Sequence, residues 1–484
     1  MDLRTALVSA DHPRARAAAL QGFIDCAAGA VVEVPPGTWV ITTIFLRSGT
    51  TLRLARGAVL KCHPEVADYP DLGHGGDGNK DRQPFHLVVA RDAVDVGITG
   101  EGTIDGNGFA FWDEPMIVLA KRGVDVEAYC DEHRLAPVYR NPVHPWWRER
   151  KRRVSPLVQF ERCIRVRLDG ILIKDSPGWT VHLDACDDVR ISDVTLRNHL
   201  FGPNTDGFDI NGCRDVVVSG CDLTCGDDAI ILKSTADSRA CERIVVTGCI
   251  LASNCAALGL GAETAHAIRD VVFAGNVIRQ ALRGVQIEMW EAGTIENVTI
   301  TGLTGSSTAD VPLQRAISLN IQHHTRSDGA LGKMRGIRIS DCTLTSRGRI
   351  IATAADGAAI EDLSLQGIRL NFPAVEDPAV SVLRQKSFQM ANSSPEARVA
   401  RGALVADNCH RLVVRDVVTV WPAAGAGAAA NTELNPYHAD APHHAAWLRR
   451  SDGLIDAPYL TAFDPAGSGI ARIAEQASRV VVLR

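Results

Sequence analysis

The chain has 484 residues, of which 46% are hydrophobic and 22% are charged. This composition is typical of a folded protein and excludes a disordered one. The formal net charge of −6 excludes the basic excess that binding to a nucleic-acid backbone requires. No stretch approaches the roughly 18 continuous apolar residues of a membrane span, so we expect neither nucleic acid nor a membrane as a partner.

The N-terminal segment predicts a short amphipathic helix over about residues 13 to 28, which would cover the open end of the fold. Asp25 interrupts the apolar run, so the segment does not read as a signal peptide. The 13 cysteines are an odd number without a paired framework, which favours reduced, buried thiols. These features predict a cytoplasmic protein, with a secreted mature form as the alternative.

A phrase of alternating β-branched and small or polar residues recurs along the chain. Seven clear copies begin near residue 166 and at residues 188, 215, 243, 270, 297 and 336, so successive starts lie 22 to 39 residues apart, and most lie 27 or 28 residues apart. No long amphipathic helix separates the copies, and the period is too short for a four-stranded propeller blade. The repeat therefore predicts an all-β parallel β-helix, a solenoid whose coils stack at about 4.8 Å around an aliphatic interior. We expect one such domain over residues 1–484.

Two regions break the period. Residues 109–155 are too long for a simple coil connection, and long loops of this kind are usually functional. We interpret them as an inserted loop or lid in which Trp146 and Trp147 stack against a sugar. The alternative is a loop whose aromatic side chains only anchor it to the protein and whose arginines are solvated. Residues 373–484 are rich in Ala, Pro and His and are expected to form the last coils and a C-terminal tail.

Two acidic motifs lie one coil apart. The sequence reads NTDG at 204–207 and GDD at 226–228, so Asp227 and Asp228 follow Asp206 by 21 and 22 residues. An isolated Asp often only fills a turn. Three carboxylates on adjacent coils, in contrast, would face the same side, where like charges disfavour joint ionisation. The spacing therefore indicates acid/base chemistry.

The stretch NTDGFDI followed by CGDDAIILKS resembles the polygalacturonase family, glycoside hydrolase family 28. Members of this family are right-handed parallel β-helices that hydrolyse pectic polysaccharides with inversion. The resemblance implies that Asp227 is the general acid, and that Asp206 and Asp228 hold and deprotonate the attacking water. It also makes Asn204 and Lys233 plausible supports for these carboxylates. Inverting enzymes typically separate acid and base by about 6.5–9.5 Å.

Two departures from the family pattern narrow the substrate. The Gly-His-Gly motif of polygalacturonases is absent, and residues 253–264 look more like the rhamnogalacturonan hydrolases, with Glu263 as a candidate sugar contact. One coil later, Gln286 and Glu288 stand where polygalacturonases carry Arg and Lys. This replacement should abolish selection for a uronate carboxylate, although Arg283 could partly compensate. We therefore expect rhamnogalacturonan or a related pectin-derived glycoside.

Further candidates for substrate binding are His182, one coil before Asp206, and Trp290, whose ring could stack on a sugar. The sequence contains no motif for a metal or a nucleotide cofactor, and we expect none. The partner would be an oligosaccharide or polysaccharide. The alternatives to a hydrolase are a catalytically inactive glycan-binding β-helix and a uronate lyase. The linkage, exo or endo action and the oligomeric state stay open, although the insertion weakly favours exo action.

Overall fold

The computed structural model contains two compact units, Met1–Ile230 and Ile231–Arg484. Among the helices that the structure describes, none is long and apolar enough to cross a membrane. The structure describes these residues: 2–27, 29–73, 83–113, 119, 123–132, 148–149, 152–307, 315–323, 329–373, 394–423 and 442–483.

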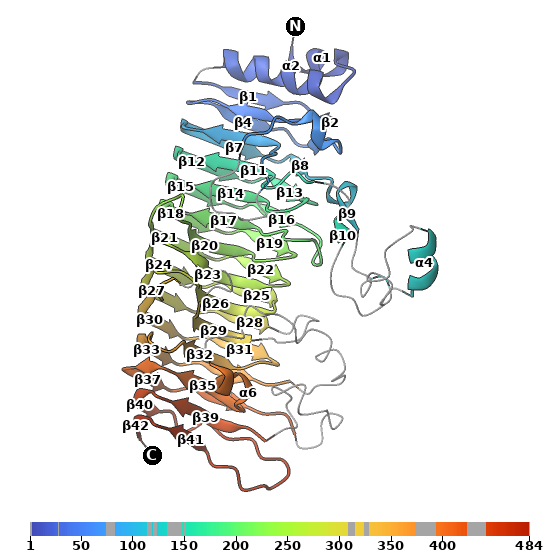
Figure 1. Ribbon diagram of the computed structural model, residues 1–484. Coiled ribbons are helices and arrows are strands. Elements are labelled where there is room, and N and C mark those ends of the chain that lie inside the picture. Colours follow the sequence, from blue (N-terminus) through green and yellow to red (C-terminus); the bar gives the residue numbers. More distant parts are fainter. Residues whose placement is uncertain are drawn as a thin grey trace. The chain divides into compact units, whose positions relative to one another are not determined.

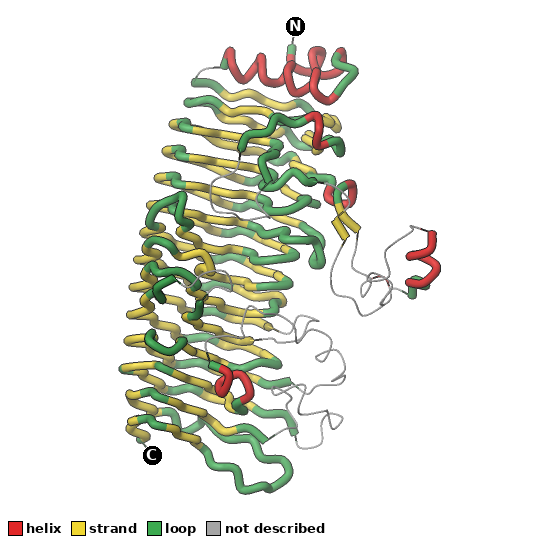
Figure 2. The backbone as a smooth tube through the Cα atoms, viewed as in Figure 1, coloured by secondary structure: helices red, strands yellow, loops and turns green. Residues whose placement is uncertain are grey.

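Two helices cover the first coil of the first unit, α1 (Leu3–Ser9) and α2 (Pro13–Cys26) (Figures 1 and 2). Pro at the first position of α2 starts the helix without losing a hydrogen bond. The buried side chains of α2 recur at helical spacing and face β2 and β3; they are Ala17, Leu20 and Ile24. The predicted capping helix over residues 13 to 28 is therefore confirmed, whereas α1 was not predicted.

Three parallel sheets, here called A, B and C, form the coils of the first unit. Sheet A contains β1 (Val31–Val34), β4 (Thr51–Leu54), β7 (Val94–Gly100), β12 (Ile164–Asp169), β15 (Asp187–Ser192) and β18 (Arg214–Ser219). Sheet B contains β2 (Gly37–Ile41), β5 (Ala58–Cys62), β8 (Thr103–Asp105), β13 (Leu172–Lys174), β16 (Thr195–Arg197) and β19 (Asp222–Cys225). Sheet C contains β3 (Ile44–Leu46), β6 (Val88–Arg91), β11 (Val158–Glu161), β14 (Val181–Asp184) and β17 (Phe208–Asn211). Outside the sheets lie η1 (Val66–Asp68), η2 (Gly108–Ala110), α4 (Val126–Glu132) and the antiparallel pair β9 (Trp112–Asp113) and β10 (Arg148–Glu149).

The second unit continues the three-sheet pattern, and the boundary between the units falls within β20 (Ile230–Ser234) of sheet C. Its sheet A contains β21 (Cys241–Thr247), β24 (Ala267–Ala274), β27 (Thr294–Thr301), β30 (Lys333–Ser340), β33 (Ile360–Gln366), β36 (Cys409–His410), β37 (Leu412–Arg415), β40 (Asp452–Asp456) and β42 (Arg479–Val482). Sheet B contains β22 (Ile250–Ser253), β25 (Val277–Gln280), β28 (Thr304–Ser307), β31 (Thr343–Ser346), β34 (Arg369–Asn371) and β38 (Val418–Val420). Sheet C contains β23 (Ala256–Thr264), β26 (Arg283–Met289), β29 (Arg315–Ile321), β32 (Ile350–Ala354), β35 (Gly402–Asp407), β39 (His444–Arg449) and β41 (Ile473–Gln476), and a short helix, α6 (Pro395–Val399), precedes β35.

Each copy of the sequence repeat covers most of a sheet A strand and the sheet B strand that follows it. Five copies begin, inside the sheet A strand, at a residue with a left-handed backbone and φ between 53° and 59°; these residues are Asp188, Asp215, Arg243, Asp270 and Asn297. Asp and Asn tolerate this conformation because their short polar side chains bond locally, which explains why most copies begin with them. The strands that follow alternate buried and exposed residues, so Val, Ile and Leu fill the interior. The predicted all-β, right-handed parallel β-helix is confirmed.

Candidate active site

The two acidic motifs of the first unit lie in turns that lead from sheet B to sheet C. Residues 106–157 follow β8, residues 198–207 follow β16, and residues 226–229 follow β19. The two acidic motifs therefore occupy the same turn on successive coils. The insertion begins at the corresponding turn of an earlier coil, after β8, which is two coils before the turn that carries Asp206 (Figure 1).

Backbone contacts hold the two acidic turns together. The Gly207 N–H donates to the Asp228 carbonyl at 2.8 Å, as in a parallel ladder between coils. The Gly226 N–H donates to Oγ1 of Thr205 at 3.0 Å, and that hydroxyl donates to the Gly202 carbonyl at 3.3 Å. These bonds place the carboxylate of Asp206 on the turn next to the one that carries Asp227 and Asp228.

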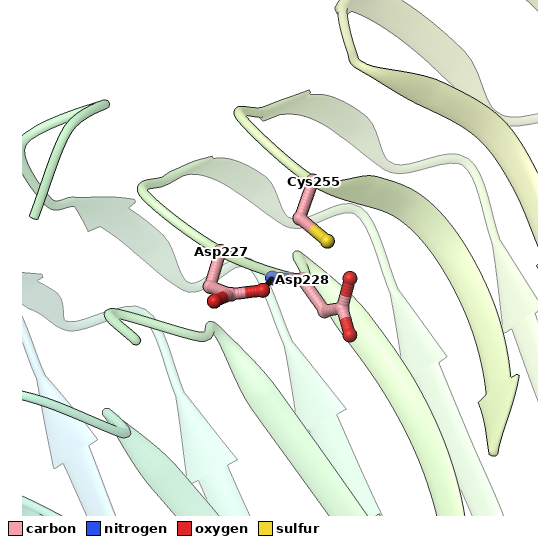
Figure 3. Close-up of side chains that lie close together, drawn as sticks. All are labelled: Asp227, Asp228 and Cys255. Atoms are coloured by element: carbon pink, nitrogen blue, oxygen red, sulfur yellow. Dashed lines mark hydrogen bonds between the residues drawn. The ribbon is translucent and has the colours of Figure 1, made fainter. Parts of the chain in front are cut away.

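The three carboxylates differ in their surroundings. Asp206 and Asp228 are buried, with 4% and 8% of their surface exposed, whereas Asp227 is partly exposed. Oδ1 of Asp227 accepts the Asp228 backbone N–H at 3.0 Å (Figure 3), and Oδ2 accepts from Nδ2 of Asn204 at 3.4 Å. One oxygen of Asp227 lies within 4.8 Å of an oxygen of Asp228. Such a pair could also ligate a cation, but acidic groups are common without one, and we assign no metal.

The thiol of Cys225 is buried immediately before the turn that carries Asp227 and Asp228. Burial raises the pKa of this thiol well above its usual range, and the charges of Asp206, Asp209, Asp227 and Asp228 raise it further. Asp209 is fully buried in β17 and was not singled out from the sequence. Asp209 is the second Asp of the NTDGFDI motif. The prediction from the sequence covers carboxylates in turns, whereas Asp209 lies inside a strand.

Native-state alkylation should separate Cys225 from the exposed thiol of Cys26. Of the 13 cysteines, none forms a disulfide; eleven are buried, Cys255 is partly exposed and Cys26 is exposed. A raised pKa lowers the thiolate fraction, and the thiolate is the species that reacts. With iodoacetamide at about pH 8, near the usual thiol pKa of about 8.5, we expect labelling of Cys26 and none of Cys225 before denaturation. Peptide mass spectrometry measures both sites, and equal labelling rates in the native protein would contradict the buried acidic cluster.

His182 lies in β14, one coil before Asp209, and contacts the side chains of Gln159 and Trp179. Its ring is 1% exposed, Nδ1 is 2.8 Å from Oε1 of Gln159, and the ring of Trp179 is 5.4 Å away between centroids. In the parallel register of sheet C, His182 pairs with Asp209. These contacts hold the imidazole of His182 in place, and its contact with a sugar stays a prediction.

The other predicted residues belong to the second unit. Lys233 is buried, and its Nζ lies 3.0 Å from Oε2 of Glu263, so its charge partner in this unit is Glu263. Arg283 is also buried and donates to Oε1 of Gln286. Glu288 is buried two residues further along β26. The partly exposed Trp290 follows that strand.

Within the insertion the structure describes residues 109–113, 119, 123–132, 148–149 and 152–155. Trp146 and Trp147, the candidate stacking residues, lie outside the described residues. Arg153 is one of the arginines that the anchored-loop alternative expects to be solvated, but it is 4% exposed and donates to Asn204. No periodicity in the sequence could have indicated this, because Arg153 stands among other arginines in an irregular segment.

The sequence is similar to a known family of glycosyl hydrolases. The sequence model of the family described as "Glycosyl hydrolases family 28" matches residues 146–356. A probable polygalacturonase of Vitis vinifera is 24% identical over 292 residues, 57% of this chain and 53% of the relative. A probable polygalacturonase of Arabidopsis thaliana is 28% identical over 165 residues, 33% of this chain and 35% of the relative. The chain therefore spans about half the length of the first relative and about a third of the second.

Two solved structures share the fold. An exopolygalacturonase from Thermotoga maritima has a TM-score of 0.58 at 21% identity, covering 75% of this chain and 85% of its own. A family 28 exopolygalacturonase from Yersinia enterocolitica has a TM-score of 0.64 at 15% identity, covering 87% of this chain and 75% of its own. At these identities the structures show a common fold. The sequence matches support glycoside hydrolase family 28, and the matched segment contains both acidic turns.

Proposed function

We propose that this chain is a glycoside hydrolase of family 28 that cleaves pectic polysaccharides or oligosaccharides by acid/base catalysis. The observation that carries the proposal is that Asp206 lies on the turn next to the one that carries Asp227 and Asp228, and that both turns fall inside the segment that matches the family. A cluster of like charges disfavours joint ionisation, so it can keep a proton on one carboxyl while another is charged. Hydrolysis of a glycoside needs this combination.

In the proposed reaction Asp227 is the general acid, since it is the most exposed of the three predicted carboxylates. Its proton passes to the glycosidic oxygen as the bond from that oxygen to the anomeric carbon breaks. Asp206 and Asp228 hold a water molecule and take its proton as its oxygen bonds to the same carbon. The products are a free reducing end and a released alcohol, and the sugar inverts because water attacks directly.

The spacing of Asp227 and Asp228 departs from the expected range. Their nearest oxygens lie within 4.8 Å, which is shorter than the about 6.5–9.5 Å typical of an acid and base in inverting enzymes. We therefore base inversion on the resemblance of the two acidic motifs to the family. In this proposal Asp206 acts as a base together with Asp228.

We infer that the substrate carries no uronate carboxylate that the protein must bind near Gln286. The Arg283 guanidinium is buried and donates to Gln286, so it is already engaged within the protein. Glu288 adds a negative charge on the same strand, which would repel a carboxylate. Rhamnogalacturonan or a related pectin-derived glycoside fits this arrangement better than homogalacturonan.

The substrate proposal is tested by incubating the protein with rhamnogalacturonan, homogalacturonan and an aryl rhamnoside. We expect new reducing ends from the first or the third and little from homogalacturonan. Preference for homogalacturonan would contradict the substrate. Binding to these glycans without turnover would favour an inactive glycan-binding protein, and an unsaturated product that absorbs in the ultraviolet would favour a lyase.

A further inference from the structure

Arg153 ends the insertion and is buried against the turn that carries Asn204 and Asp206. Nη1 donates to the Pro203 carbonyl at 2.6 Å and to the Pro177 carbonyl at 3.3 Å. Nη2 donates to Oδ1 of Asn204 at 3.2 Å. A guanidinium that serves three acceptors is fixed in orientation by its planar fork, which a lysine cannot reproduce.

Asn204 passes this orientation on to Asp227. A guanidinium can only donate, so the Asn204 oxygen must face Arg153 and its amide nitrogen must face the other way. There Nδ2 donates to Oδ2 of Asp227 at 3.4 Å. The backbone of Asn204 has φ 47°, a left-handed conformation that Asn tolerates, so the side chain starts from a defined position.

The start of the insertion packs against the same turn. The Phe109 ring lies 4.8 Å from that of Trp112 and 5.5 Å from that of His199, and the Trp112 and His199 rings are 5.9 Å apart. The His199 carbonyl accepts the Gly202 N–H at 2.8 Å, which folds the turn back on itself. Both ends of the insertion therefore contact residues 199–204.

We propose that Arg153 is a positioning residue for the reaction: through the Asn204 side chain it sets the direction of the Asp227 carboxylate and couples the insertion to the acidic turns. This inference rests on the proposed function, because it needs Asp227 to act in turnover. It goes beyond that function by assigning a role to a residue outside both acidic motifs. A misplacement of a reacting group by about 1 Å can cost about 100-fold in rate.

The test compares Arg153→Met, Asn204→Ala and the double variant on the substrate that the wild type turns over. We expect each single variant to lower kcat by about 10- to 100-fold with KM little changed, because substrate contacts remain while the acid is misdirected. The double variant should lose no more than the worse single one, because both changes break one relay. Arg152→Met is the matched control: Arg152 is exposed and stacks over Phe85 at 4.5 Å, so its removal should leave kcat unchanged.

Several results would overturn the role of Arg153. They are an unchanged kcat in Arg153→Met, a raised KM at constant kcat, or losses that multiply in the double variant. Should Arg153→Met not fold, Arg153→Lys decides, because it keeps the charge but lacks the planar fork whose two nitrogens reach Pro203 and Asn204 separately: a lowered kcat supports the proposal and a wild-type kcat overturns it. Wild-type turnover with unaffected Arg153 variants would refute this inference alone, whereas no wild-type turnover on any glycan would remove both it and the proposed function.

Discussion

Replacing Asp227 with Asn is expected to lower kcat by about 100- to 10,000-fold while the protein keeps its fold. Loss of a general acid typically costs this much, because the leaving oxygen must then depart without a proton. The Asn side chain has the same shape, and its oxygen can still accept the Asp228 N–H as Oδ1 of Asp227 does. Steady-state kinetics with circular dichroism melting measures both properties.

Asp215→Asn is the matched control for this change. Asp215 is exposed, has a left-handed backbone with φ 57°, and is the second residue of β18 in sheet A. Asn tolerates the same backbone, so kcat and Tm should both stay at wild-type values. Turnover retained in Asp227→Asn would contradict the assignment of the acid. A loss of turnover that also occurs in Asp215→Asn would show that the effect is not specific to the acidic turns.

Gly226→Ala should separate the two acidic turns and lower kcat by about 100-fold, with a loss of stability. A Cβ at this position would lie 2.4 Å from the Gly202 carbonyl oxygen, 2.4 Å from Oγ1 of Thr205 and 2.7 Å from the His199 carbonyl oxygen. Two of these three atoms belong to the backbone, so relief requires the turn before Asp206 to move. Kinetics and thermal unfolding of the variant measure this effect.

Gly22→Ala serves as the control for Gly226→Ala. In helix α2 a Cβ on Gly22 would meet nothing within 4 Å. Ala in a helix interior is favoured over Gly by about 0.5–1 kcal/mol, so this variant should be equally active and slightly more stable. A Gly226→Ala protein with wild-type kcat would show that contact between the acidic turns does not matter for turnover.

The sequence predicts the fold well because the β-helix repeats one local pattern. The left-handed residue, the alternating strand and the aliphatic interior recur from coil to coil, most often after 27 or 28 residues, so a local signal is repeated many times. The proximity of Asp206 to Asp227 and Asp228 can be predicted in the same way, because a separation of about one coil places them on neighbouring turns. The length of the repeat therefore predicts contacts between residues that are about one coil apart in the sequence.

The rest of the site depends on contacts that no period predicts. Arg153 reaches Asn204 across 51 residues from the end of an irregular insertion. His182 forms a hydrogen bond with Gln159, and this contact can be predicted only when the register between β11 and β14 is known. Lys233 and Glu263 pair across 30 residues, slightly more than one repeat, so the sequence alone left the partner of Lys233 undefined.

The most direct test of the acidic turns as a hydrolytic site is the configuration of the first product, followed by proton NMR from the start of the reaction. Direct attack of a water held by Asp206 and Asp228 predicts that the anomer opposite to that of the substrate appears first, and that mutarotation then produces the other anomer. A first product with the configuration of the substrate would mean that a side chain attacks the sugar, as the short separation of Asp227 and Asp228 would permit. That result would contradict the mechanism proposed for this protein.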